Sequence, residues 1–364
     1  MRFRDFGSSI GRWPTGPLNA ITDVAGLRVG QVSYVRDGQT VFRTGATVIW
    51  PHPGNPYLER VYAATDILNG YGIMTGRAVI AEWGLLGSPV VLTNTRSIGH
   101  AYEAVVQELT DLDPGTGHLD VVMPVVAECD DGYLNDNRGP AIPVSIIRQA
   151  LQEARPGGEV EEGSVGAGSG TQLFGFKGGI GTSSRRVEIE GATYTLGVLV
   201  NTNFGARHQM IVNGYPVGRE LQHELLPDYD HEGSCIGVLA TDAPLWPNQL
   251  RRLAKRIGLG LVRTGSVGND GSGEIFLAFS TARRVPREHA GPLPSSHLVD
   301  GQFWTQGSPI DPLFEATVEA SEEAVMNALV AARTVTGRDG HRLHAFPVER
   351  YTPLLGGTHR RVGH

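Results

Sequence analysis

Short apolar runs rich in Val, Ile and Leu alternate along the chain with stretches of helical periodicity, and this alternation limits the folds open to it. The runs are apolar throughout rather than at every second residue, which is typical of strands covered on both faces. The expected strands are residues 45–50, 88–92, 121–126, 194–200, 236–240 and 274–279. The expected helices are residues 100–110, 143–153, 247–258 and 313–333. The pattern predicts a layered α+β or α/β domain.

Charge and cysteine usage exclude several classes of protein. The chain of 364 residues has 31 basic and 38 acidic side chains, and its formal charge of −7 argues against a nucleic-acid-binding protein. No apolar run is long enough for a membrane-spanning helix or a secretory signal. Cys129 and Cys235 lie far apart in the sequence and lack the spacing of a metal or redox pair, which favours a reducing compartment. We therefore expect a cytoplasmic protein.

The common catalytic and binding motifs are absent or out of place. A GxSxG match at residues 7–11 has no room before it for the strand that a nucleophile elbow needs. Residues 166–170 lack the lysine and hydroxyl of a phosphate loop, and we expect a flexible loop there. His341 and His344 are close in sequence, but no HExxH motif or further ligand accompanies them. The sequence predicts neither a metal nor an organic cofactor.

Three segments place a hydroxyl, a carboxylate or an amide next to an apolar run. They are residues 199–205, 230–236 and 263–275. In the second, a polar, turn-prone stretch changes abruptly into the apolar run at Ser234, which predicts that Ser234 is the first residue of a core strand. Each segment alone is also consistent with a turn that makes local hydrogen bonds.

Taken together, these segments resemble the DmpA-like family of L-aminopeptidases/D-esterases, which includes β-peptidyl aminopeptidases and nylon-oligomer hydrolases. The similar stretches run nearly from end to end of the chain. Among them are TGPLNAITDVAGLRVGQV, VVLTNTRSIGHAYEA, MPVVAECDDGYLND, FGFKGGIGTSSR, LGVLVNTNFG, GSCIGVLATDAPLWPNQLRRLAKR and RTGSVGNDGSGEIFLAFSTA.

The resemblance implies a four-layer αββα sandwich that forms a single catalytic domain over residues 1–364. It implies an N-terminal-nucleophile-type hydrolase that cuts itself between Gly233 and Ser234, giving an α chain of residues 1–233 and a β chain of residues 234–364. The expected activity is an aminopeptidase or amidohydrolase acting on short peptides, amides or esters, without a cofactor. Family members are commonly homo-oligomers, which we expect here as well.

Ser234 suits the role of nucleophile on chemical grounds. A serine hydroxyl reacts only when a base removes its proton, and the α-amine of a terminal Ser234 would be such a base. Its reference pKa of about 7.7 to 8.0 lies close to working pH. Before the cut, the same hydroxyl can attack the carbonyl of Gly233, whose backbone tolerates strain. His231 and Glu232 are possible helpers on which the mechanism does not depend.

The resemblance also assigns roles to three residues beside the nucleophile. Ser272 and Glu274 match the family's Ser-x-Glu pair, and residues two apart on a strand share a face, so both can point into the site. Glu274 would hold the Ser272 hydroxyl and orient the α-ammonium of Ser234. Asn203 matches the family's asparagine that donates to the oxyanion, and Asn201 is a competitor because it shares the same strand face.

Substrate-binding residues are expected in two further stretches. Glu128 stands where aminopeptidases of the family have a glutamate that receives the substrate's free amine. Asp130 stands where some members have an aromatic residue, which predicts a more acidic amine pocket, suited to a longer or β-amino substrate. Lys177 matches a lysine near the site in some relatives, although a role outside the site is equally open.

Three alternatives to a self-processing aminopeptidase remain open. A nylon-type endo-amidase or an acyltransferase would use the same nucleophile without needing a free amine. An unprocessed, inactive scaffold or binding protein would have the same fold and no cut. A conventional Ser-His-Asp hydrolase would depend on one histidine in an uncut chain.

Overall fold

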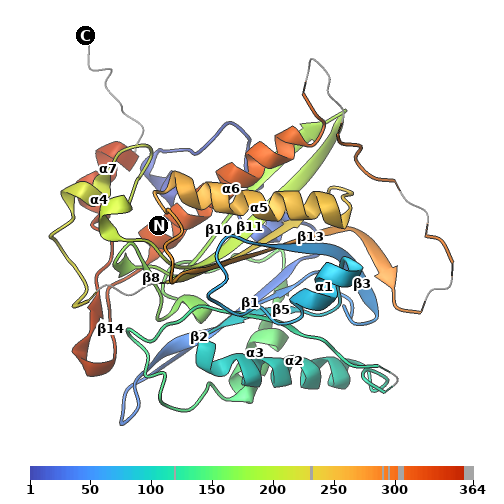
Figure 1. Ribbon diagram of the computed structural model, residues 1–364, viewed down its shortest axis with the longest axis horizontal. Helices are drawn as coiled ribbons and strands as arrows, with labels where there is room; N and C mark the ends of the chain where they lie inside the picture. The colour runs from blue at the N-terminus through green and yellow to red at the C-terminus, as the bar shows by residue number, and fades with distance from the viewer. Residues whose placement is uncertain (119, 230–232, 289–290, 294–295, 302–306, 356–364) are drawn as a thin grey trace.

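Two β-sheets packed face to face form the centre of the computed structural model, and a pair of helices covers the outer face of each sheet (Figure 1). The structure describes residues 1–118, 120–229, 233–288, 291–293, 296–301 and 307–355. From one side to the other, the layers are helices α5 and α6, the second sheet, the first sheet, and helices α2 and α3 (Figure 1). The predicted αββα sandwich is confirmed.

The first sheet has the strand order β6-β5-β2-β1-β7. Its strands are β1 (Arg28–Arg36), β2 (Phe42–Trp50), β5 (Val90–Thr93), β6 (Val125–Glu128) and β7 (Arg155–Pro156). All its pairings are antiparallel except that between β5 and β6. Helices α2 (Ile98–Leu112) and α3 (Val144–Glu153) bury Val105 and Ile147 against Val48 and Val91 of this sheet.

The second sheet has the order β10-β11-β12-β13-β3-β4 and contains the segments that carry the expected chemistry. Its strands are β10 (Ile180–Ile189), β11 (Ala192–Asn203), β12 (Ser234–Thr241), β13 (Gly273–Pro286), β3 (Glu59–Ile67) and β4 (Leu85–Leu86). Strands β12 and β13 run parallel at its centre, and β11 pairs with β12 in the antiparallel direction. Helices α5 (Pro247–Arg263) and α6 (Asp311–Ala331) cover its outer face.

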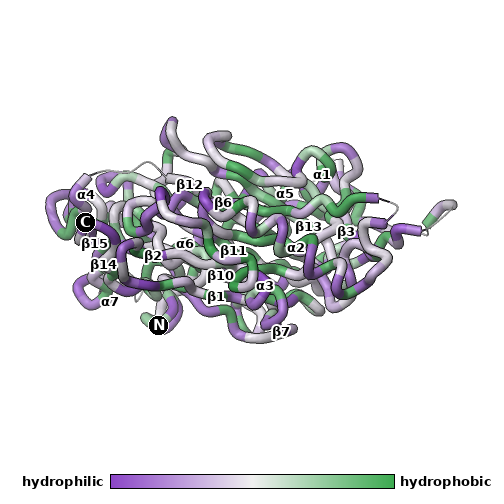
Figure 2. Tube along the Cα trace, turned by 90° about the horizontal axis from the view of Figure 1, so that it is seen from below, coloured by the Kyte–Doolittle hydropathy of each residue, from purple (hydrophilic) through white to green (hydrophobic). Residues whose placement is uncertain are grey.

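Smaller elements complete the fold. They are α1 (Arg77–Trp83), α4 (Val217–Glu220) and α7 (Val348–Leu355), the two-stranded pairs β8 (Gln172–Leu173) with β9 (Phe176–Lys177) and β14 (Val335–Thr336) with β15 (Arg342–Leu343), and 3₁₀ turns at Phe3–Phe6, Ile21–Asp23, Thr95–Ser97, Gly166–Gly168, Arg207–Gln209 and Arg338–Gly340. Apolar residues gather along the central strands and helices, whereas many peripheral loops are hydrophilic (Figure 2). No described helix has the length and apolar character needed to cross a membrane.

The side chains of β12 alternate strictly between two hydrophobic cores. Ile236 and Val238 join the core between the two sheets, together with Leu199 of β11. Cys235 and Leu239 join the core between the second sheet and helices α5 and α6. Because all eight residues of β12 are buried, the strand is the apolar, doubly covered type that its sequence predicted.

Two local predictions were wrong. Of the run 121–126, only Val125 and Val126 belong to β6, because Pro124 has no amide to donate to a strand partner. Residues 166–170, expected to be a flexible loop, are buried between β2 and β10. A Cβ atom at Gly170 would lie 2.0 Å from the Arg43 carbonyl oxygen, so these glycines permit close backbone packing.

Candidate active site

A cleft of about 940 Å³ lies where β12 of the second sheet begins and β6 of the first sheet ends. Segments far apart in the sequence meet there. Its lining residues are Gly70, Tyr71, Gly72, Ile73, Thr95, Arg96, Glu128, Asp130, Asn137, Gly233, Ser234 and Gly271. Four of the residues singled out from the sequence, Glu128, Asp130, Gly233 and Ser234, thus share one cavity.

Ser234 is the first residue of β12, as the sequence predicted. Its backbone pairs with Asn203 on one side and with Gly273 on the other. The side chain is 5% exposed, and its hydroxyl makes no hydrogen bond with any described residue. The thiol of Cys129 lies beside this hydroxyl, and burial raises the pKa of that thiol, which keeps it protonated at neutral pH. A buried hydroxyl without a partner is costly unless it serves a further purpose.

Gly233 precedes Ser234 at the entrance to the strand and lies against β11. A Cβ atom at this position would lie 1.5 Å from the carbonyl oxygen of Asn203, so every residue but glycine would push the two strands apart. The carbonyl oxygen of Gly233 accepts a hydrogen bond from the backbone N–H of Gly273 at 3.1 Å. The peptide that precedes Ser234 is therefore held between β11 and β13.

Ser272 and Glu274 lie together, as their spacing predicted, but on the face of the sheet away from the Ser234 side chain. The Ser272 hydroxyl donates a short hydrogen bond to Glu274. Both residues are buried, and Glu274 lies beside Cys235, on the side of helices α5 and α6. Burial raises the pKa of the Glu274 carboxyl, and the hydrogen bond from Ser272 opposes this shift. The Glu274 carboxylate and the Ser234 hydroxyl therefore lie on opposite faces of the second sheet.

The two asparagines at the end of β11 differ in their contacts. The amide of Asn203 donates to the carbonyl of Asp130 at 2.8 Å and accepts from the N–H of Gln172 at 3.0 Å. The side chain of Asn201 is fully buried, and neither its nitrogen nor its oxygen has a partner among the described residues. Asn203 thus ties β11 to the Asp130 loop, whereas the Asn201 amide has hydrogen-bonding capacity to spare.

Glu128 is a buried carboxylate in the wall of the cleft. One oxygen accepts the backbone N–H of Ile73 at 3.0 Å, and the other accepts the Thr95 hydroxyl at 2.5 Å. Burial raises the pKa of Glu128, while these two hydrogen bonds lower it and the nearby charge of Asp130 raises it further. A cationic ligand would stabilise this buried carboxylate by supplying the opposite charge.

Asp130 contributes a second carboxylate to the same wall. Its Oδ1 accepts hydrogen bonds from the backbone N–H of Gly132 and from the side chain of Asn137, at 2.9 and 2.5 Å. Thr95, Ile73 and Arg96 complete this wall, and the sequence analysis singled out none of them. Thr95 and Arg96 lie within the TNTRSIG stretch, where a run of polar residues directly after an apolar strand was the available signal.

Lys177 does not line the cleft. Its buried ammonium donates to three backbone carbonyls, those of Gly168, Thr171 and Gly178, at 2.7, 2.8 and 2.9 Å. Burial lowers the pKa of Lys177 to about 7, and burial raises the pKa of nearby Asp131 to about 7. These contacts hold the loops behind the site and leave no donor of Lys177 free for a substrate.

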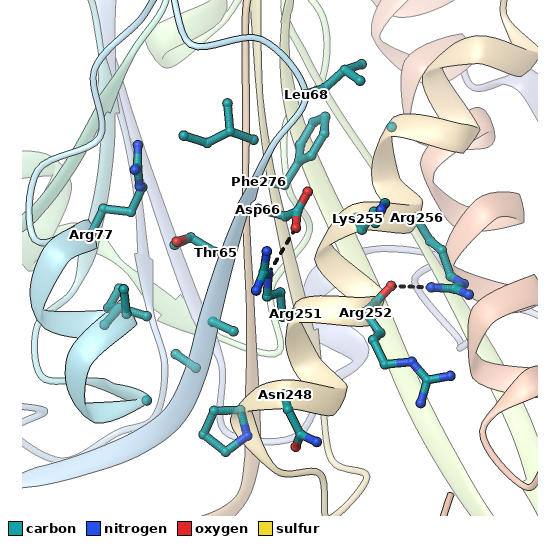
Figure 3. Close-up of a pocket in the computed structure, with 18 of the residues that line it drawn as sticks. Thr65, Asp66, Leu68, Arg77, Asn248, Arg251, Arg252, Lys255, Arg256 and Phe276 are labelled. Atoms are coloured by element: carbon teal, nitrogen blue, oxygen red, sulfur yellow. Dashed lines mark hydrogen bonds and ion pairs between the residues drawn. The ribbon is translucent and has the colours of Figure 1, made fainter. Parts of the chain in front are cut away.

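A second cavity, of about 1340 Å³, lies on the outer side of the second sheet between α1 and α5 (Figure 3). Arg77 projects from α1, and Arg251, Lys255 and Arg256 project from α5, with Asp66 of β3 paired to Arg251 at 3.3 Å. This cavity is larger than the cleft but contains none of the predicted catalytic residues.

The remaining predictions about ligands concern histidines and metals. His231 and Glu232 lie outside the described residues. Over the part of the chain that the structure describes, no group of three or more His, Cys, Asp and Glu side chains could hold a metal ion. His341 instead stacks on Tyr133 and contacts Asp228 at 2.9 Å, away from the cleft.

Comparison with known proteins gives consistent results. The model of peptidase family S58 matches residues 19–343. The β-peptidyl aminopeptidase BapA of Sphingosinicella microcystinivorans is 42% identical over 375 residues, which cover 97% of this chain and 91% of that protein. BapA of Sphingosinicella xenopeptidilytica is 37% identical over 372 residues, covering 97% and 90%.

Two solved structures extend the likeness to the fold. The PH0078 protein of Pyrococcus horikoshii OT3 superimposes with a TM-score of 0.90 at 42% identity, covering 97% of this chain and 98% of that one. The L-aminopeptidase D-Ala-esterase/amidase of Ochrobactrum anthropi, described as a prototype of the serine aminopeptidases with a variant Ntn-hydrolase fold, gives 0.88 at 40% identity, covering 96% of both chains. The chain belongs to peptidase family S58.

Proposed function

We propose that this protein is a serine aminopeptidase that activates itself by cutting the Gly233–Ser234 bond and then uses Ser234 as its nucleophile. The observation that carries the proposal is the placement of an unpaired Ser234 hydroxyl in the same cleft as the buried carboxylate of Glu128. The names of the relatives, β-peptidyl aminopeptidase and serine aminopeptidase, support the same activity.

In the proposed self-cleavage, the Ser234 hydroxyl oxygen attacks the carbonyl carbon of Gly233. The Gly233 C–N bond breaks, an ester to Ser234 forms, and the nitrogen of Ser234 takes up the proton. The N–H of Gly273 already donates to the Gly233 oxygen, where negative charge develops in this step. Water then hydrolyses the ester, which releases the α chain of residues 1–233 and leaves Ser234 with a free α-amine.

In the proposed turnover, that α-amine takes the proton of the Ser234 hydroxyl as the hydroxyl attacks the substrate. The Ser272–Glu274 pair would orient the amine, because Gly273, which lies between these two residues, is the strand partner of Ser234. Asn203 donates one amide N–H to the Asp130 carbonyl, and its second N–H would donate to the oxyanion of the tetrahedral intermediate. The amine product leaves, and water hydrolyses the acyl-enzyme.

The proposed requirement for a free amino group rests on Glu128 and Asp130. Both carboxylates line the cleft beside Ser234, and an ammonium ion between them and the nucleophile would place the first carbonyl of the substrate for attack. The acidic pocket and the named relatives favour β-amino residues at the substrate's N-terminus. Lys177, expected from the resemblance to bind substrate, is better suited by its carbonyl contacts to support the loops behind the site.

A pair of substrates tests this proposal against the endo-amidase and acyltransferase alternatives. β-Alanyl p-nitroanilide carries a free amine, and its N-acetylated analogue does not. We expect the free amine to be hydrolysed with a kcat/KM at least about 100-fold higher, because the blocked analogue loses its charge-assisted contact with a buried carboxylate. Preferential turnover of the acetylated compound would refute the aminopeptidase assignment and favour an endo-amidase.

A conventional Ser-His-Asp mechanism is less well supported. No histidine lines the cleft among the described residues. Homo-oligomeric assembly and a cytoplasmic location remain predictions from the sequence.

A further inference from the structure

The cleft carries charge of both signs. Arg96 is the one cationic side chain among its described lining residues, beside the acidic Glu128 and Asp130. The side chain of Arg96 is exposed, and its Nε donates to the carbonyl of Gly139 at 3.1 Å. It forms no ion pair with a described residue. Its two terminal nitrogens are therefore available to bind an anion.

Arg96 is held close to the expected amine site. It lies in the 3₁₀ turn Thr95–Ser97, whose preceding residue, Asn94, accepts the N–H of Ser97 at 3.0 Å and so fixes the turn. The adjacent residue, Thr95, donates its hydroxyl to Glu128. Arg96, Thr95 and Glu128 all line the same cleft, so the cation and the amine-binding carboxylate face one cavity.

The charge of Arg96 should favour the binding of substrates that carry a carboxylate. A carboxylate that enters the cleft meets the negative charges of Glu128 and Asp130, which repel it. The Arg96 guanidinium can bind such a carboxylate through two parallel N–H donors. A neutral substrate residue makes no such contact, so the loss of Arg96 should weaken binding most for a substrate that carries its own negative charge.

We infer that the enzyme favours substrates whose N-terminal residue carries a free carboxylate next to its free amine, the simplest being aspartate linked through its side-chain carbonyl. Glu128 would hold the ammonium and Arg96 the adjacent carboxylate, while the β-carbonyl faces Ser234. This inference rests on the proposed aminopeptidase function and adds the substrate class to it.

Two chromogenic probes test the inference because they differ only by this carboxylate: β-aspartyl p-nitroanilide and β-alanyl p-nitroanilide. The wild-type enzyme should show the higher kcat/KM for the β-aspartyl compound. Arg96→Gln should lower the ratio of the β-aspartyl to the β-alanyl kcat/KM by about tenfold or more, mainly through the KM of the β-aspartyl probe. Arg138→Gln, which removes an exposed arginine paired with Asp136 outside the cleft, is the matched control and should leave this ratio unchanged.

The other possible outcomes refute either the role of Arg96 or the proposed function. A wild-type preference for the β-alanyl probe, or the same ratio of the two probes in Arg96→Gln as in the wild type, overturns the role of Arg96. The role of Arg96 is also refuted if the chain is cut before Ser234 and hydrolyses β-alanyl but not β-aspartyl p-nitroanilide. The proposed function stands in that case. An uncut chain that hydrolyses neither probe overturns the proposed function and this inference with it.

Discussion

Two buried polar clusters on the second sheet differ in whether their hydrogen bonds are satisfied. At one, between β10 and α6, the fully buried Arg185 donates to Glu319 at 3.1 Å and to Glu323 at 2.8 Å. Its remaining N–H groups bind Ser183 and backbone carbonyls, including that of Ile10. The positive charge of Arg185 is therefore balanced, and its N–H groups are hydrogen-bonded, within the protein.

At the other, around the start of β12, polar atoms are equally buried but unpaired. The Ser234 hydroxyl, both amide atoms of Asn201 and one oxygen of Glu274 have no hydrogen bond to a described residue. Evolution seldom retains such atoms without a use for them. The comparison suggests that the first cluster stabilises the fold and the second is kept available for a reaction, and substitutions in the two clusters should separate these roles.

The largest effect on activity is expected for Ser234→Ala. Without the nucleophile, turnover of β-alanyl p-nitroanilide should fall by at least about 10⁴-fold, as it does when a covalent catalyst loses its attacking group. The fold should be kept, because the substitution removes no hydrogen bond to the described residues. Steady-state kinetics measures the turnover, and a circular dichroism spectrum checks the fold. Appreciable residual turnover would remove Ser234 from the mechanism.

Arg185→Met should have the opposite effect and lower the stability of the protein rather than its catalytic activity. The buried carboxylate of Glu319 would lose its counter-charge and that of Glu323 would keep only Arg4, which should lower the free energy of unfolding by about 3 to 5 kcal/mol. Urea unfolding followed by fluorescence measures this change. The control is Arg12→Met, which removes an exposed ion pair with Glu315 and should leave stability nearly unchanged. Equal losses of stability for Arg185→Met and Arg12→Met would contradict a stabilising role of the buried cluster.

Glu274→Gln should lower kcat by about 100-fold, because the α-amine of Ser234 loses the group that orients it. The pH dependence gives a sharper test. A negative charge on Glu274 stabilises the protonated amine and raises its pKa, so removing that charge should lower the pKa. The rising limb of the kcat profile should therefore move to lower pH. An unshifted limb would mean that Glu274 does not act on the amine.

Asn201→Leu is expected to have the smallest effect on stability, within about 1 kcal/mol, because its amide has no partner to lose. Asn203→Leu breaks the hydrogen bonds to Asp130 and Gln172 and should be clearly more destabilising. Denaturant unfolding of the two variants side by side makes the comparison. A larger loss of stability for Asn201→Leu than for Asn203→Leu would contradict the view that the Asn201 amide has no partner.

The sequence allowed most of the central layers to be predicted, for a definite reason. Strands such as β12 and β13 are covered on both faces, so their sequences are continuously apolar and easily recognised. Strand β10 was not predicted, because its centre contains Thr182, Ser183, Ser184 and Arg185, all buried. Those residues become compatible with a core only through partners on α6 and in the N-terminal segment, which no local pattern reveals.

The candidate site shows the same limit. The position of Ser234 at the start of a strand and the pairing of Ser272 with Glu274 follow from local spacing. The separation of Ser234 and Glu274 onto opposite faces depends on the parallel register of β12 and β13, which pairs Ser234 with Gly273. The contribution of Thr95 and Arg96 depends on the packing of the two sheets, and therefore needed the structure.

The central claim is that the polypeptide is cut between Gly233 and Ser234 by its own nucleophile. The most direct test is a denaturing gel of the purified wild-type protein and of Ser234→Ala, with N-terminal sequencing of every band. We expect two bands for the wild type, the smaller beginning Ser-Cys-Ile-Gly, and a single uncut band for the variant. A single wild-type band, or a second band that begins elsewhere, would contradict the account.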